Sequence, residues 1–192
     1  VTSCQYMVDA VSNLFYGMPI NGYVALNMNA VAMINDAVGG VTVTVPEDMT
    51  QVDPSFAEGA TVTLTGDQAL KFTRYRDTEK DFSNNSRMER QKQYLVNFMG
   101  QAVKAMKADM GLPVSLYQSL TDDMVTNLSL DRSVYLATEA MDMHFTADGI
   151  VSLKAKSKKG SVYDEVYVDD DALYDLIIQT FYTEEQSEGE SK

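Results

Sequence analysis

Apolar residues recur every three to four positions in seven stretches of this chain, which is the spacing of a helix that buries one face. The stretches are residues 5–15, 29–38, 65–74, 86–110, 114–120, 132–143 and 168–182. Thr65 is a candidate N-cap for the third stretch, and either Asp131 or Ser129 caps the sixth. Gly111 and Pro113 end the longest stretch. The pattern therefore predicts a strongly helical chain.

Two apolar or β-branched runs flank the helix predicted at 29–38, which Asn29 opens. The run YVALNM at 23–28 precedes it, and GGVTVTVP at 39–46 follows it. Because strand–helix–strand connections within one sheet are almost always right-handed crossovers, we expect these two strands to lie parallel. This arrangement predicts the α/β fold class. The polar, turn-rich segment 47–64 is expected to form an excursion on the surface.

Near the C-terminus, apolar and polar residues alternate on both sides of a Lys-Lys-Gly-Ser turn, which predicts a hairpin over 149–169 with Gly160 in the turn. Asp169, Asp170 and Asp171 then open the last helix. Three acids at a helix start satisfy exposed amides and the helix dipole, so we interpret them as a cap and not as a metal cluster. We expect one domain over residues 1–182 and a disordered acidic tail over 183–192.

Charge and composition exclude several classes of protein. The chain has 192 residues, one cysteine and a formal net charge of −13. So acidic a chain lacks the basic surface that bulk nucleic-acid binding requires, and Cys4 alone excludes an internal disulfide framework. No apolar run approaches the roughly 18 residues of a membrane helix. P-loop, dinucleotide-binding, zinc-hydrolase and serine-nucleophile motifs are missing from the sequence, and the single His144 is interpreted as structural.

Basic residues concentrate in the window 64–95. Arg87 and Gln91 share one face near the start of the long helix, where free amides and the helix dipole favour an anion, and Arg90 lies on a flank of the same turn. Each planar guanidinium holds a phosphate through two charge-assisted hydrogen bonds. The window predicts a pyrophosphate site, with a solvated and mutually paired charged surface as the alternative. It contains four of the five arginines of the chain: Arg74, Arg76, Arg87 and Arg90.

Three separated blocks of the chain carry, in order, a resemblance to a known family. They are the D-A-hydrophobic-G-G-V turn at 36–41, the L-x-G-x-Q-A-L block with R-x-R at 64–76, and the R-x-x-R-Q block at 87–91. These blocks resemble the LytR-CpsA-Psr (LCP) family of bacterial cell-wall assembly enzymes, and the match spans residues 13 to about 101.

The resemblance implies an α-β-α sandwich with a central mixed, largely parallel sheet and a C-terminal hairpin plus helix. LCP enzymes transfer a phosphoglycan, such as teichoic acid or capsular polysaccharide, from a polyprenyl-pyrophosphate carrier to peptidoglycan, usually with Mg2+. The match implies that Asp81 and Arg87 take part in catalysis. It identifies no metal ligand in this chain. It implies that the pyrophosphate is bound by Arg74, Arg76, Arg87 and Gln91, and the spacing on the helix adds Arg90.

The family resemblance also implies where the chain acts and which part of the family's domain has no counterpart here. Its members act outside the membrane at the cell envelope, commonly through an N-terminal anchor, so we expect an extracytoplasmic chain that meets the membrane surface through a lipid substrate or a missing anchor. The family's N-terminal S-I-P-R-D-like strand and metal-holding aspartates have no counterpart here. We therefore expect an N-terminally incomplete domain that acts as a phosphotransferase when that segment is supplied. The alternative is non-catalytic binding of an anionic cell-wall polymer or a polyprenyl-phosphate lipid.

One side of the long helix is rich in methionine. The residues that share this face are Met88, Leu95, Phe98, Met99, Val103, Met106 and Met110. Flexible thioethers conform to an irregular chain, so the face predicts either a slot for the polyprenyl tail or plain core, and the sequence leaves both open.

Overall fold

The computed structural model describes residues 3–77, 83–161 and 164–182. The chain divides into two compact units, one formed by residues 21–150 and the other by residues 1–20 together with 151–192. The arginine window lies in the first unit. The boundary between the predicted domain and its tail stays a prediction, because residues 183–192 lie outside the described part of the chain.

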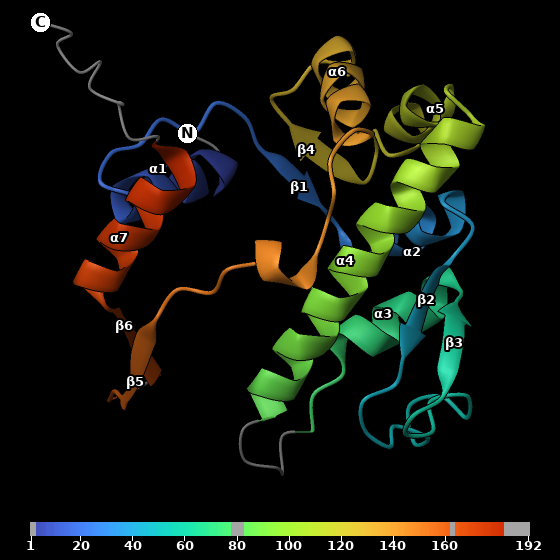
Figure 1. Cartoon of the computed structure of the whole chain (residues 1–192), viewed down its shortest axis with the longest axis horizontal. Helices are drawn as coiled ribbons and strands as arrows, with labels where there is room; N and C mark the ends of the chain where they lie inside the picture. Colours follow the sequence, from blue (N-terminus) through green and yellow to red (C-terminus); the bar gives the residue numbers. More distant parts are fainter. Residues whose placement is uncertain (1–2, 78–82, 162–163, 183–192) are drawn as a thin grey trace, which may run out of the picture. The chain divides into compact units, whose positions relative to one another are not determined.

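Helices dominate the unit 21–150 (Figure 1). Figure 1 shows α4 as the longest helix, and α3 packs against α4, as α5 and β2 also do. All the predicted helices in this unit are confirmed, with shifts of a few residues at their ends. The elements in chain order are β1 (Val24–Leu26), α2 (Met28–Ala37), β2 (Val41–Thr44), β3 (Thr61–Leu64), α3 (Gly66–Arg74), α4 (Ser83–Ala108), α5 (Leu112–Ser119), β4 (Met124–Thr126), α6 (Leu130–Ala140) and the 3-10 turn η1 (Ala147–Gly149).

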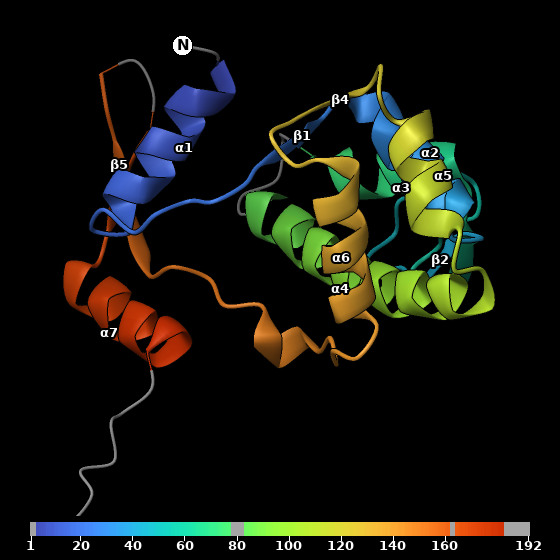
Figure 2. The ribbon, with the colours of Figure 1, turned by 90° about the horizontal axis from the view of Figure 1, so that it is seen from above.

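The pairing of the strands contradicts the parallel crossover. β1 pairs with β4, with Val24 opposite Thr126, and β2 pairs with β3, with Val41 opposite Leu64. Both pairs are antiparallel, and the described residues contain three two-stranded antiparallel sheets with no central parallel sheet. The chain is a mixed α/β protein, so the predicted class is confirmed and the largely parallel sheet is wrong. The views in Figures 1 and 2 show β1 beside β4 and away from β2.

The segment 47–60 is mostly exposed turns, as predicted, but two of its apolar side chains enter the core. Met49 and Phe56 are both 0% exposed, and the backbone N of Met49 donates to O of Phe56 at 2.9 Å. The segment then continues into β3. Its exposed polar residues face solvent, while these two apolar side chains enter the hydrophobic core. The polar composition of the segment therefore gave no sign of two buried core residues. The central cluster contains Val38, Val41, Val43, Val45, Met49, Phe56, Leu64, Ala69 and Phe72.

Helix α4 packs through a face that only partly coincides with the predicted one, sharing Phe98 with it. Tyr94, Phe98, Ala102 and Ala105 pack against the central cluster. Met88, at 46%, and Met110, at 65%, are largely exposed. Successive packing residues are separated by four, four and three positions. This spacing fits helical periodicity as well as the methionine series does. The two ends of the methionine series are therefore exposed, and the choice between plain core and a slot for a lipid stays open.

The caps of the helices follow local chemistry. Thr65 caps α3 in a capping box with Gln68, and Ser129 caps α6, which decides between the two candidates. Asn27 caps α2 by accepting from the backbone N of Asn29 and Ala30, so the cap lies two residues before the predicted one.

The second unit contains the predicted hairpin and terminal helices. Its elements are α1 (Ser3–Leu14), β5 (Ala155–Lys159), β6 (Asp164–Val168) and α7 (Asp170–Phe181). β5 and β6 pair antiparallel, with Ala155 opposite Val168, which confirms the hairpin. Asp169 accepts from the backbone N of Ala172, so the capping interpretation of this acid is confirmed. The described helices include none that is long and apolar enough to cross a membrane.

Candidate functional site

The arginine window folds into a junction between the C-terminus of α3 and the first turns of α4. Two neighbouring side chains of α4 reach across it. Arg90 donates through Nε to O of Phe72 at 3.0 Å and through an Nη to O of Tyr75, and Gln91 donates through Nε2 to O of Thr73 at 3.0 Å. These carbonyls belong to the helix end, where intrahelical partners are missing. The junction therefore fixes the end of α3 against α4.

Arg90 is buried at this junction, with 1% of its surface exposed. Its Nη1 lies 2.6 Å from Oε1 of Glu47, which follows β2. Burial lowers the pKa of Arg90, the Glu47 carboxylate opposes this shift, and nearby Arg87 adds to it. All three guanidinium nitrogens thus donate to protein groups. We predicted that Arg90 contacts a ligand, and the structure places it behind the surface.

Arg87 lies one turn before Gln91 and is only half-buried. Its Nη2 donates to Oδ1 of Asn84 at 2.7 Å, which holds the side chain along the first turn of α4. Its Nε is buried and has no hydrogen-bond partner among the described residues. A buried donor on a charged group is costly to leave unpaired. Arg87 is thus only partly satisfied by the described part of the chain.

The remaining predicted residues lie on the α3 side. Arg74 is the last residue of α3, its side chain is exposed, and no other described residue forms a hydrogen bond or ion pair with it. Arg76 follows two residues later and is also exposed. Asp81 lies outside the described residues, so its role stays a prediction. The structure thus brings together the segments that carry Arg74, Arg87 and Gln91.

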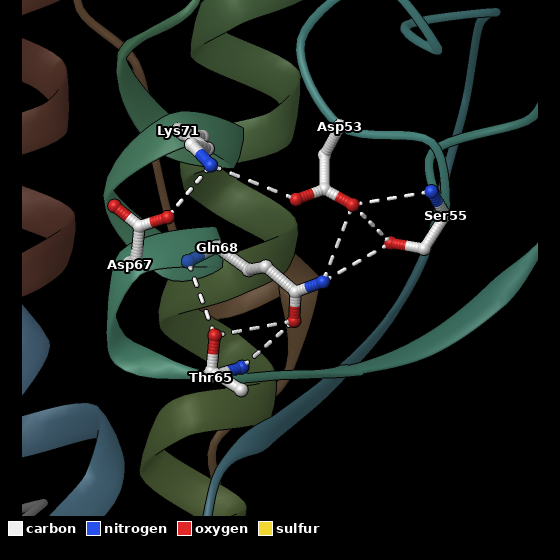
Figure 3. A network of polar contacts seen from close by, with 6 residues as sticks. All are labelled: Asp53, Ser55, Thr65, Asp67, Gln68 and Lys71. Atoms are coloured by element: carbon white, nitrogen blue, oxygen red, sulfur yellow. Dashed lines mark hydrogen bonds and ion pairs between the residues drawn. The ribbon is translucent and has the colours of Figure 1, made fainter.

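A polar network supports α3 from the side of the segment 47–60 (Figure 3). Figure 3 shows Asp53 between Ser55, Gln68 and Lys71. Asp53 Oδ1 accepts from Ser55 Oγ at 2.7 Å, and Gln68 Nε2 donates to Ser55 Oγ at 3.1 Å. The hydrogen bonds from Ser55 lower the pKa of Asp53. The network therefore ties the loop to the helix that ends at Arg74.

Most residues of the three sequence blocks have structural tasks. Gly39 and Gly40 adopt φ values of +84° and +85°, and a Cβ on Gly40 would lie 2.9 Å from O of Leu64. Leu64 and Ala69 are buried in the core. Gln68 belongs to the capping box of α3. Packing accounts for these positions, whereas it does not account for Arg74 or for the free Nε of Arg87.

The described residues do not form a metal site. No group of three or more His, Cys, Asp and Glu side chains within 3–77, 83–161 and 164–182 is arranged to hold a cation. Mg2+ has no ligand set here and stays a prediction from the family.

An apolar cavity of about 210 Å³ lies between α4, α5 and α6. Met106 and Phe98 line it from α4, so part of the methionine-rich face borders a cavity. Other lining residues are Val24, Val38, Ala102, Leu112, Pro113, Leu116, Tyr117, Leu120, Met124, Ser133 and Ala137. Such a cavity suits an aliphatic chain.

Three residues of the junction were missed by the sequence analysis. Asn84 orients Arg87, Glu47 neutralises Arg90, and Thr73 accepts from Gln91 through its backbone oxygen. The spacing of Asn84 and Arg87 by three residues on one helix is a usable signal. Nothing local in the sequence connects Glu47 with Arg90.

The fold and junction define a mixed α/β domain with an arginine-bearing helix pair. Residues 3–178 match the LytR_cpsA_psr family model, so the chain belongs to the LytR_cpsA_psr family.

Two relatives are teichoic acid transferases by name. The polyisoprenyl-teichoic acid–peptidoglycan teichoic acid transferase TagU of Bacillus cereus (strain AH820) is 46% identical over 83 residues, which are 42% of this chain and 27% of TagU. TagU of Halalkalibacterium halodurans is 31% identical over 129 residues, which are 66% of this chain and 40% of that protein. The aligned part of the chain thus spans less than half the length of these curated relatives.

Solved structures share the fold. The crystal structure of B. subtilis TagV has a TM-score of 0.70 at 23% identity, and the match covers 94% of this chain and 71% of TagV. The structure of TagT bound to LI-WTA has a TM-score of 0.67 at 18% identity, covering 90% of this chain and 63% of TagT. At these identities the likeness shows the fold alone.

Proposed function

We propose that the α3–α4 junction binds the pyrophosphate of a polyprenyl-pyrophosphate-linked glycan. The observation that carries the proposal is the buried Nε of Arg87, which has no partner among the described residues while its Nη2 is held by Asn84. A phosphate oxygen would satisfy this donor through a charge-assisted hydrogen bond. The exposed Arg74 at the adjacent helix end offers a second guanidinium.

Each residue of the proposed site has its own role in binding the pyrophosphate. Arg87 and Arg74 come from two helices and approach one anion from two directions, which suits a pyrophosphate with its two charged phosphorus centres. Arg76 extends the same segment. Gln91 is oriented by its bond to Thr73 and keeps its Oε1 and second amide proton for a ligand. In the chain's acidic surroundings these cations form a local anion site.

The proposed reaction is transfer of the phosphoglycan to a hydroxyl of peptidoglycan. The hydroxyl oxygen forms a bond to the glycan-linked phosphorus, and the bond from that phosphorus to the bridging oxygen breaks. Polyprenyl phosphate leaves and carries away the proton of the hydroxyl. Positioned arginines neutralise the charge that moves onto the bridging oxygen without changing protonation. This transfer agrees with the activity named for the TagU relatives.

The same proposal includes the lipid, the place and the cofactor. The apolar cavity beside Met106 and Phe98 would accept a more distant part of the polyprenyl chain, since these residues lie about three to five helical turns along α4 from Arg87. Teichoic acid and peptidoglycan, named for the relatives, support a proposed activity at the cell envelope. Asp81 as a catalytic residue and Mg2+ as a cofactor remain parts of the proposal that rest on the family.

Isothermal titration of this chain with geranyl pyrophosphate, with and without Mg2+, tests the binding step. Arg87→Ala should weaken binding by about 1.5–3 kcal/mol, since a charged donor is removed. Arg132→Ala on α6 is the matched control, because Arg132 lies outside the junction, and it should bind like the parent. Equal binding by Arg87→Ala and the parent would refute the site.

Turnover requires a second assay. Incubation with a lipid-linked teichoic acid and peptidoglycan should release polyprenyl phosphate if this chain is catalytically competent. Binding without release would favour the alternative, a non-catalytic binder of an anionic cell-wall polymer or polyprenyl-phosphate lipid.

A further inference from the structure

We infer that Arg90 is a positioning residue, which holds the helix end that bears Arg74 against the helix that bears Arg87. The inference rests on the proposed function, because it concerns the geometry of the same pyrophosphate site. Within the R-x-x-R-Q block, Arg87 contacts the ligand, and Arg90 holds the two helix segments in place.

The contacts of Arg90 connect three segments. Nε donates to O of Phe72 at 3.0 Å, an Nη donates to O of Tyr75, and Nη1 bonds Oε1 of Glu47 at 2.6 Å. The guanidinium carbon also lies 5.7 Å from the centroid of the Tyr75 ring. Only a planar fork with several fixed donors satisfies acceptors in these different directions at once.

The end of α3 depends on these contacts. Tyr75, its C-cap, has φ −53° and ψ 135°, so the helix does not end in the left-handed glycine turn that usually satisfies terminal carbonyls. Arg90 and Gln91 supply donors to the carbonyls of Phe72, Thr73 and Tyr75 instead. The backbone from Phe72 to Tyr75 includes Arg74. Side chains of α4 therefore determine the position of the backbone that carries Arg74.

Burial and charge keep Arg90 out of direct binding. Its surface is 1% exposed, and Glu47 neutralises it at 2.6 Å. The pair adds no net charge to the junction, so the charge offered to a ligand comes from Arg74 and Arg87. A frame of this kind sets the separation between cations of two helices. A fixed separation favours a two-phosphate anion over a single phosphate.

The test measures the preference of the full 192-residue chain for geranyl pyrophosphate over geranyl phosphate by calorimetry. Arg90→Lys retains the charge but loses the fork, and Arg132→Lys is the matched control on α6. Glu47→Gln is a second, milder variant that retains an acceptor for Arg90. We expect Arg90→Lys to weaken pyrophosphate binding roughly tenfold and to reduce the preference over monophosphate, at unchanged binding stoichiometry. Partial unfolding would lower the stoichiometry and leave the preference unchanged.

Hydrogen–deuterium exchange of the unliganded chain supplies a readout that needs no ligand. Arg90→Lys should accelerate exchange over residues 72–77 while β2 and β3 keep the exchange of the parent. If the parent binds pyrophosphate and Arg90→Lys retains its affinity and preference within about twofold, the positioning role is refuted. Unchanged exchange over 72–77 refutes it as well. If the parent does not bind, the proposed function fails, and accelerated exchange would then leave Arg90 with a purely structural role.

Discussion

Oδ1 of Asp36 accepts a hydrogen bond of 2.7 Å from the backbone N of Gly66, so the end of α2 caps the start of α3. The next residue back, Asn35, is 0% exposed and donates through Nδ2 to O of Leu64 at 2.8 Å. These two bonds set the start of α3 as Arg90 and Gln91 set its end. The helix that carries Arg74 is therefore held at both ends by side chains of other helices.

Gly66→Ala should destabilise the fold. A Cβ at this position would lie 2.7 Å from O of Ala32 and 2.7 Å from Oδ2 of Asp36, so α2 and α3 would have to separate. We expect the free energy of unfolding to fall by about 1–3 kcal/mol, measured by urea denaturation. Gly100→Ala is the control, since its Cβ would meet nothing within 4 Å in the middle of α4. That variant should gain about 0.5–1 kcal/mol, and equal effects of both changes would contradict the close packing at Gly66.

Glu47→Ala should leave the Arg90 guanidinium buried with an unpaired donor. The expected loss in free energy of unfolding is about 1–3 kcal/mol, toward the lower end because the Glu47 side chain is 32% exposed and water can reach it. Denaturant unfolding measures it, and Glu58→Ala, an exposed glutamate of the same loop segment, is the control. If Glu47→Ala destabilises the protein no more than Glu58→Ala does, the Arg90–Glu47 pair does not hold the junction.

The stability contributed by Asp53 should depend on pH. Hydrogen bonds from Ser55 lower the pKa of Asp53 below its ordinary value of 3.8, so the folded state favours the carboxylate. This contribution is complete above about pH 4 and is lost as the pH falls through the lowered pKa. Asp53→Asn should therefore cost about 1 kcal/mol in free energy of unfolding at pH 7 and less at pH 3. A cost that is the same at both pH values would contradict the network, and Asp122→Asn serves as an exposed control.

Local signals in the sequence predicted the helices and caps well. Hydrophobic periodicity located the helices, and Thr65 and Asp169 cap helices as their side-chain chemistry predicts. The pairing of strands was not predictable in this way. β1 takes its partner β4 from about a hundred residues later in the chain, and a strand of three residues carries no signal for so distant a choice.

The burial of Arg90 was not predicted, because the sequence analysis assigned a different set of α4 residues to the buried face. The predicted series contains Phe98, which packs against the central cluster, but it also contains Leu95, which is 47% exposed. It omits Tyr94, which packs against the same cluster. Arg90 lies four residues before Tyr94 and continues that buried face. With the correct phase, the sequence would have separated a buried Arg90 from the more exposed Arg87.

The most direct test of the pyrophosphate site is a double-mutant cycle on Arg74 and Arg87, read by titration with geranyl pyrophosphate. Each change to alanine should weaken binding by about 1 kcal/mol or more. Because both guanidiniums are proposed to hold one anion, the double variant should lose less than the sum of the single losses, with a coupling of about 0.5 kcal/mol or more. Binding that neither change weakens, or losses that simply add, would contradict a shared site at the α3–α4 junction.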